Sequence, residues 1–188
     1  MFNIKKNLIC GSLCILLFTS PSTAEVGRKS PSLDGTVSAG PYYNPATKSY
    51  FELIKMQNIP GEESRWFGAK ARAEKSFFKN TPGRLAIINN LETHQFLMRT
   101  FSSTDYWIGL QYFCRSKALK WVDGTDATQT KFSAWDTRWS NTKIRCANMD
   151  YMPVHYTTKT ATKALRWRAS GPNKGYVDYL VEYPTGKE

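Results

Sequence analysis

The hydrophobic pattern of the chain is strongest in two short segments, residues 105–111 and 119–125. The first surrounds Trp107 with an apolar run that is too short for a helix and is interrupted by Gly109, which is typical of a buried strand that another backbone approaches. The second alternates apolar and polar positions around Trp121 and ends at an Asp-Gly pair, which is typical of a strand closed by a turn. We therefore predict two paired strands whose tryptophans meet in one core.

Upstream of these segments, residues 42–54 predict a β-hairpin, because two aromatic-rich runs flank an Asn-Pro-Ala-Thr turn. Ser64 is predicted to cap a helix that runs to about residue 80. Apolar residues recur along this helix at helical spacing, and we expect it to pack through Trp66, Ala69, Ala73 and Phe77.

A second helix is predicted after a short strand at residues 85–88. It begins with an Asn89-x-x-Glu92 arrangement that is typical of a capping box, and it is expected to reach Phe101. Beyond this helix the pattern predicts strands and loops. Because the helices do not alternate regularly with the strands, the order of elements favours an α+β domain over a fold of repeated βαβ units.

Residues 1–24 have the composition of a secretory signal peptide. Lys5 and Lys6 precede an apolar stretch, and Pro21 is followed by small residues that suit a signal peptidase. Cleavage before Glu25 is therefore predicted, with export of the protein to the periplasm or secretion from the cell. No later stretch approaches the ~20 apolar residues that a transmembrane helix requires.

Residues 25–41 are rich in Gly, Ser and Pro, and they predict a flexible leader. The folded domain is therefore expected over residues 42–188. The formal net charge of the full chain is +11, and removal of Lys5 and Lys6 with the signal peptide leaves the remainder strongly basic.

A series of spaced motifs extends through the predicted domain. In order, they are Trp66-x-x-Ala69, Gly83-x-Leu85-Ala86-x-Ile88, Glu92-x-x-x-Phe96-Leu97, Trp107-Ile108-Gly109-Leu110, Trp121-x-Asp123-Gly124, Phe132-x-x-Trp135, Cys146-Ala147, Trp167 and residues 179–184. Their order and spacing resemble the C-type lectin-like domain, and the signal peptide and the Asn-Pro-Ala-Thr turn look like its bacterial branch. The resemblance implies a C-type lectin-like fold of two helices flanking small antiparallel sheets, with a long loop region that binds ligands.

The cysteines depart from the pattern of that family. The resemblance places one long disulfide at positions that Ala73 and Val181 occupy, so apolar packing is expected to replace it. Cys146 matches a family cysteine, but its usual partner is missing, and Cys114 is the other cysteine that remains after cleavage. Because two cysteines in an oxidising compartment more often pair than stay free, we predict a Cys114–Cys146 disulfide.

The calcium ligands of the family are also missing. The resemblance places an oxygen-rich triplet at Trp139-Ser140-Asn141, where only the asparagine would suit the metal, and a second pair of ligands at Arg168 and Ala169. A guanidinium repels a divalent cation. We therefore predict no bound calcium, no other metal and no cofactor.

The long loop region that the resemblance implies is strongly basic. Between Asp136 and Arg168 the only acidic residues are Asp136 and Asp150, whereas the basic residues are Arg138, Lys143, Arg145, Lys159, Lys163, Arg166 and Arg168. Trp167 is expected in the core. Arginines pair with carboxylate, sulfate or phosphate, and aromatic rings pack on sugar faces. The predicted ligand-binding residues are Arg138, Trp139, Asn141, His155, Arg166 and Arg168; the alternative is an ordinary solvated basic face.

Export, family and charge together favour a calcium-independent module that binds acidic glycans or lipopolysaccharide. The alternative is an adhesin or host-interaction factor that binds a host or envelope protein. An enzyme is not expected, because His94 and His155 are interpreted as surface histidines without a catalytic partner, and the export signal argues against nucleic acid. Alanine at Arg138, Arg166 and Arg168 is expected to remove binding without unfolding, because exposed charges contribute little to stability.

Overall fold

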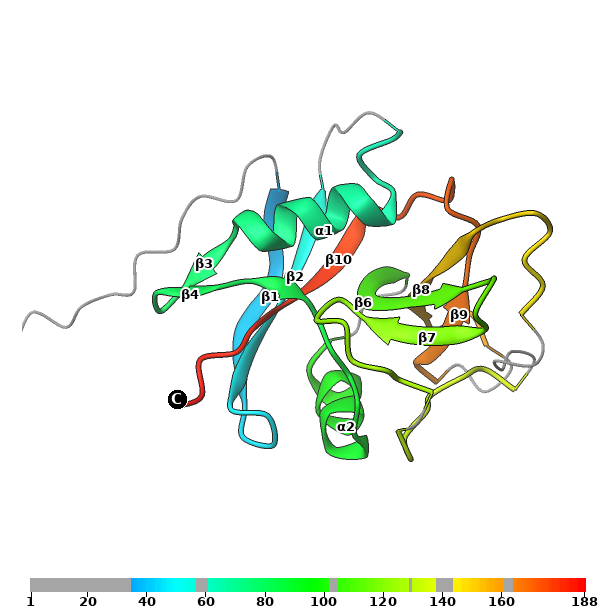
Figure 1. Ribbon diagram of the computed structural model, residues 1–188. Helices are drawn as coiled ribbons and strands as arrows, with labels where there is room; N and C mark the ends of the chain where they lie inside the picture. The colour runs from blue at the N-terminus through cyan, green and yellow to red at the C-terminus, as the bar shows by residue number, and fades with distance from the viewer. Residues whose placement is uncertain (1–34, 57–60, 102–104, 129, 138–143, 161–163) are drawn as a thin grey trace, which may run out of the picture.

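A computed structural model describes residues 35–56, 61–101, 105–128, 130–137, 144–160 and 164–188 (Figure 1). The predicted signal peptide, residues 1–24, lies outside these ranges. None of the helices in the described ranges is long and apolar enough to cross a membrane. The elements are β1 (Gly35–Asn44), β2 (Ser49–Met56), α1 (Trp66–Lys75), β3 (Phe77–Phe78), β4 (Thr81–Pro82), β5 (Arg84–Leu85), α2 (Leu91–Thr100), β6 (Tyr106–Phe113), β7 (Ala118–Trp121), β8 (Tyr151–Thr157), β9 (Arg166–Ala169) and β10 (Asp178–Tyr183).

The main sheet has the order β1-β2-β10-β6-β8-β9, with β7 paired to β6 and β5 paired to β10. The pair β10–β6 is parallel and the other pairs are antiparallel. The last strand along the chain is therefore central in the sheet. The Glu182 carboxylate of β10 accepts hydrogen bonds from Ser49 Oγ (2.9 Å) and from the backbone N–H of Ile87 (3.1 Å), which fasten this strand to its surroundings. The predicted α+β class is confirmed.

Two hydrophobic clusters lie on opposite faces of the sheet, as the alternation along β10 shows. Tyr179 and Val181 join the cluster that contains the buried face of α1, whereas Leu180 joins the larger cluster that contains Leu97 of α2. Successive side chains of a strand point to opposite faces, so one strand can serve both cores. Figure 1 shows α1 and α2 on the two sides of the sheet.

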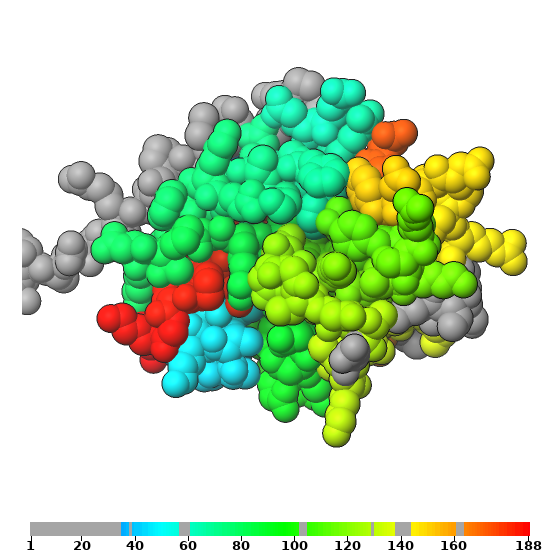
Figure 2. All heavy atoms as spheres, viewed as in Figure 1, coloured from blue at the N-terminus to red at the C-terminus, as the bar shows by residue number. Residues whose placement is uncertain are grey.

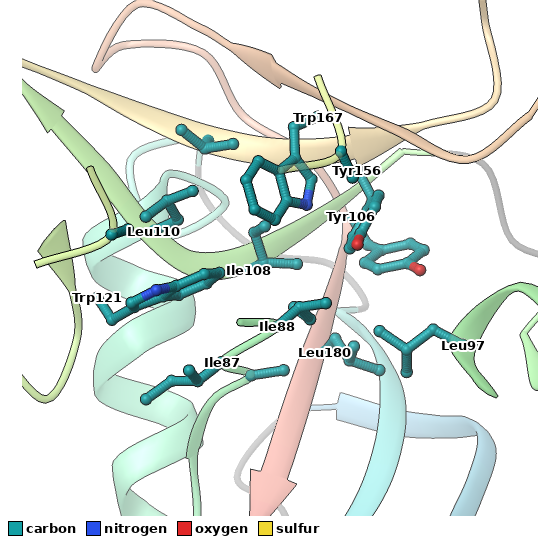
Figure 3. Packing of buried hydrophobic residues seen from close by; sticks show 14 of the residues in the cluster. Ile87, Ile88, Leu97, Tyr106, Ile108, Leu110, Trp121, Tyr156, Trp167 and Leu180 are labelled. Carbon is teal, nitrogen blue, oxygen red and sulfur yellow. The ribbon is translucent and has the colours of Figure 1, made fainter. Parts of the chain in front are cut away.

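The two tryptophans that were predicted to share one core lie in different clusters. Trp121 is the register partner of Leu110 and packs in the larger cluster with Trp167 and Ile108 (Figure 3). Trp107 lies three residues before Leu110 on the same strand, and this odd spacing turns the Trp107 side chain to the other face of the sheet. There its Nε1 donates to the backbone oxygen of Ser64 (2.9 Å). The prediction of one shared core was wrong.

The predicted hairpin is confirmed, and it begins earlier than expected. Tyr43 of β1 pairs with Tyr50 of β2, and the register continues to Gly35 opposite Met56. Residues 35–41 therefore belong to the sheet, although the sequence pattern assigned them to the flexible leader. Gly, Ser and Pro disfavour an isolated strand, but here β2 supplies the hydrogen-bonding partners.

Helix α1 begins at Trp66 and ends at Lys75, so both predicted limits were too wide. Ser64 is not the N-cap; its hydroxyl instead donates to the backbone oxygen of Gly61 (2.8 Å). At the other end Ser76 takes an extended conformation, and its Oγ donates to the Ala73 oxygen (2.6 Å). Phe77 consequently lies in β3 with 43% of its surface exposed, whereas Trp66, Ala69 and Ala73 are buried as predicted.

Helix α2 is capped one residue later than the capping-box pattern predicted. The Asn90 side chain accepts a hydrogen bond from the backbone N–H of Thr93 (2.7 Å), and the helix starts at Leu91. The helix still ends where expected, because Phe101 is its C-cap.

Gly109 permits a close backbone approach to β6, as the apolar run around it predicted. A Cβ atom at this position would lie 2.6 Å from the Leu85 oxygen and 2.9 Å from Val122 Cγ2. We expect Gly109→Ala to lower the free energy of unfolding by about 1–3 kcal/mol in urea denaturation, because neither neighbour can move without disturbing the sheet. Gly61→Ala is the control, because no atom lies within 4 Å of its added Cβ; equal stability of the two variants would contradict the close approach.

Candidate ligand-binding site

The described part of the long loop region is built around β8 and β9. Residues 134–136 run along the outer edge of β9, because the backbone N–H of Trp167 donates to the Ala134 oxygen (2.7 Å) and the N–H of Asp136 donates to the Trp167 oxygen (3.1 Å). Trp167 is 1% exposed, and its ring packs against Trp135. The prediction that Trp167 belongs to the core is confirmed.

Three predicted ligand-binding residues, Arg138, Trp139 and Asn141, lie outside the described residues. Their roles stay predictions. The other three, His155, Arg166 and Arg168, are placed on β8 and β9, where each of them contacts protein groups.

Arg168 is committed to an internal ion pair. Its Nε and Nη2 atoms donate to Asp136 Oδ2 at 2.9 and 2.6 Å, and Nη2 also donates to the backbone oxygen of Lys159 (2.6 Å). The side chain of Asp136 is 3% exposed and that of Arg168 is 21% exposed. One guanidinium therefore joins β9 to the segment before residue 138 and to the segment after β8.

Asp136 was not predicted as the partner of Arg168, because the contact that brings the two residues together is visible only in the structure. Trp135 and Trp167 form an isolated bridge, so the residues that follow these two tryptophans emerge side by side. An Asp and an Arg in those two positions are suited to pair.

Lys159 is engaged in a second ion pair nearby. Its ammonium lies 2.5 Å from Asp105 Oδ2, with 70% of the lysine side chain exposed and 12% of the aspartate side chain exposed. Burial pushes the pKa of Asp105 upward, but hydrogen bonds from Lys159 and Thr157 outweigh burial and hold the pKa below its ordinary value. The positive charge of this region is thus partly neutralised by aspartates.

Both histidines are buried, so the interpretation of them as surface histidines was wrong. His155 lies on β8, where Nδ1 is 3.1 Å from Ser170 Oγ and Nε2 is 3.1 Å from the Tyr176 hydroxyl. The strand is covered on both faces, which a short run of mixed residues did not reveal. A direct ligand contact by His155, which is 3% exposed, would require this cover to open.

His94 points from α2 towards β8 and β9. Arg166 Nη1 lies 3.3 Å from His94 Nε2, and a guanidinium can only donate, so Nε2 accepts. The neutral ring then carries its proton on Nδ1, which donates to the Tyr156 hydroxyl at 2.8 Å. Arg166, predicted as a ligand contact, therefore also selects the tautomer of a buried imidazole.

The pKa values of both histidines are lowered to about 4. For His94 the causes are burial and the charge of Arg166. For His155 burial is the largest cause, and it outweighs the opposing effect of the Asp105 charge; the cations Arg168, Lys174 and Lys159 also lower the pKa. Both rings are therefore neutral at neutral pH.

This burial predicts a loss of stability in mild acid. The unfolded chain binds protons at the ordinary histidine pKa of 6.5, whereas the folded chain binds them near pH 4. Stability is therefore complete above pH 6.5 and falls between pH 6.5 and 4, by up to ~1.4 kcal/mol per pH unit for each histidine. Denaturant unfolding across this range should show it, and His94→Gln should reduce the slope; an unchanged slope would argue against the buried neutral ring.

The disulfide joins the turn after β6 to the segment before β8. Cys114 and Cys146 are bonded, with their Cα atoms 5.9 Å apart, so the predicted pairing is confirmed. Ala73 and Val181 are both fully buried in the cluster beneath α1, in agreement with apolar packing at the positions of the missing family disulfide.

Comparison with known proteins identifies the family. The sequence matches the family model of the Lectin C-type domain over residues 71–171, which is more than half of the chain. The chain therefore belongs to the C-type lectin domain family, a class of lectin-like binding modules. No curated protein matches the chain.

Solved structures support the same fold. A complex of SPL-1 with GlcNAc has a TM-score of 0.52 at 15% identity and covers 73% of this chain and 88% of its own. The Ca²⁺-independent C-type lectin SPL-2 from Saxidomus purpuratus also has a TM-score of 0.52 at 15% identity, with coverage of 74% and 88%. The trimeric Kupffer cell receptor Clec4f has a TM-score of 0.51 at 22% identity, with coverage of 78% and 83%.

Among the residues that the structure describes, no group of three or more His, Cys, Asp or Glu side chains could hold a metal ion. Asp136, the buried carboxylate of the loop region, is bound by Arg168. Freedom from calcium stays a prediction that binding experiments must test.

The ion pair corrects the expectation that Arg168 can be removed without effect on the fold. We expect Arg168→Ala to lower the free energy of unfolding by about 3–5 kcal/mol, because it removes the guanidinium that donates two hydrogen bonds to the buried Asp136 carboxylate. Lys131→Ala is the control, since Lys131 is exposed. The free energy of unfolding is measured by urea denaturation for both single variants and for the double variant Arg168→Ala with Asp136→Ala. A double variant that is no more stable than Arg168→Ala would contradict this coupling.

Proposed function

We propose that the protein is an exported, calcium-independent lectin-like module of bacterial type that binds acidic glycans or lipopolysaccharide. The observation that carries the calcium independence is the Arg168 guanidinium, held by Asp136 and the Lys159 oxygen. The resemblance to the family places a calcium ligand at residue 168. A fixed positive charge there joins the loop segments and opposes a divalent cation.

Export is supported by the predicted signal peptide and by the Cys114–Cys146 disulfide, because disulfides persist in oxidising compartments. The acidic nature of the ligand is supported by the net charge of +11. Among the structural neighbours, SPL-1 was solved with GlcNAc and SPL-2 is described as Ca²⁺-independent, so the proposed combination of sugar binding and calcium independence is reasonable for this fold.

We expect the protein to bind immobilised heparin or lipopolysaccharide in surface plasmon resonance at 0.1 M salt. Binding should fall steeply towards 1 M salt, because the Debye length shrinks from ~10 Å to ~3 Å. A chelator should leave the affinity unchanged, and millimolar calcium should leave the melting temperature unchanged.

A dextran surface is the uncharged control. Absence of binding to both anionic surfaces at low salt would reject the acidic-glycan function and favour a protein partner, as in an adhesin. Loss of binding in the chelator would reject calcium independence alone.

A further inference from the structure

An exposed basic surface in the described residues lies at the tip of the β6–β7 hairpin. The turn at residues 114–117 connects the two strands, and the disulfide holds the segment before β8 beside it. The backbone N–H of Cys114 also donates to the Asp150 oxygen (2.8 Å). Figure 2 shows the green residues of this tip beside the yellow residues that precede β8. We call Arg115, Lys117, Lys120 and Arg145 the hairpin-tip surface.

All four side chains of the hairpin-tip surface belong to exposed residues. Residues 106–122 contain no Asp or Glu, and the segment before β8 brings Asp150 to the tip. Asp126 lies opposite Lys120 in an isolated β-bridge, so the charge of Lys120 is partly balanced. Within the part of the chain that the structure describes, Arg115, Lys117 and Arg145 form no ion pair. They differ in this respect from Arg168 and Lys159, whose charges are bound by aspartates.

The disulfide determines how close the two arginines are. Arg115 follows Cys114 and Arg145 precedes Cys146, whose Cα atoms are 5.9 Å apart. Because consecutive Cα atoms are ~3.8 Å apart, the Cα atoms of the two arginines lie within about 14 Å of each other. Both long side chains can therefore reach one extended anion.

Aromatic side chains adjoin these charges. Phe113 and Tyr151 are register partners on β6 and β8, and both are partly exposed. The Lys120 ammonium lies 5.9 Å from the centre of the Phe113 ring, and Phe67, which is 53% exposed, packs its ring 5.3 Å from that of Tyr151. Rings beside cations suit a ligand that has both apolar faces and negative groups.

We infer that the hairpin-tip surface contacts the anionic groups of an acidic glycan. This inference rests on the proposed function and moves the main electrostatic contact away from Arg166 and Arg168, whose side chains serve the interior. The chemistry fits sulfated or uronic sugars, in which negative groups alternate with pyranose faces.

Lys117 offers a sharp test because of its backbone conformation. Its φ of 52° is in the left-handed region, which a lysine adopts at a cost and which asparagine tolerates better. Lys117→Asn should therefore remove the charge without a loss of stability. Lys48 has a φ of 51° in the β1–β2 turn, at a distance from the hairpin tip, so Lys48→Asn is a matched control (Figure 1).

The experiment compares two triple variants that lose the same charge. One is Arg115→Gln, Lys117→Asn and Arg145→Gln; the other is Lys48→Asn, Lys75→Gln and Arg99→Gln, which changes exposed cations elsewhere. Thermal melting confirms folding, and binding to immobilised heparin is measured at 0.1 M salt. We expect the hairpin-tip variant to lose roughly tenfold in affinity and the control variant much less.

Equal losses in the two folded triple variants would overturn the inference, while binding by the wild type would leave the proposed function in place. Absence of heparin binding by the wild type would reject both. If the hairpin-tip triple variant fails to fold, Lys117→Asn against Lys48→Asn decides, and equal affinities of these two would overturn the inference.

Discussion

Burial of the central strands on both faces is the constraint on which this structure depends. Strand β10 contributes Leu180 to one core and Val181 to the other, so a helix or a layer of loops must cover each side of the sheet. The same constraint explains why a side chain at Gly109 is unfavourable, since the backbone oxygens of Leu85 and Ala86, at the end of β5, approach β6 closely. The long loop region is attached to this rigid frame through β8 and β9.

Positive charge in the loop region and at the hairpin tip serves two separate purposes. Arg166 and Arg168 stabilise buried partners, His94 and Asp136, and they hold β9 in relation to α2 and to the preceding loop. Arg115, Lys117 and Arg145 at the hairpin tip form no ion pair among the described residues, so a binding partner can use their charge. A count of basic residues along the sequence does not separate these two groups, because the separation depends on which residues the strands bring together.

Local patterns predicted the hairpin, both helices and the α+β class, because each of these depends on residues that are near in the sequence. The disulfide could be predicted because only two cysteines remain after the predicted cleavage. The errors arose where tertiary contacts decide. The odd spacing of Trp107 and Leu110 placed the two tryptophans on different faces, and β2 made a strand from residues that resemble a linker. His94 was misplaced because the structure around α2, rather than the helix itself, buries its ring.

The position of β10 affects how this chain can fold during synthesis and during the proposed export. In a chain that emerges with its N-terminus first, the residues of β2 and β6 are synthesised long before residues 178–183. The latter must insert between these two strands. Until then, two strands that will be central in the sheet have unpaired edges, which are prone to pair with other chains. In the proposed export, a carrier that keeps the chain unfolded until β10 has crossed the membrane would protect these edges. The topology of the sheet therefore favours late, concerted folding, after β10 has become available.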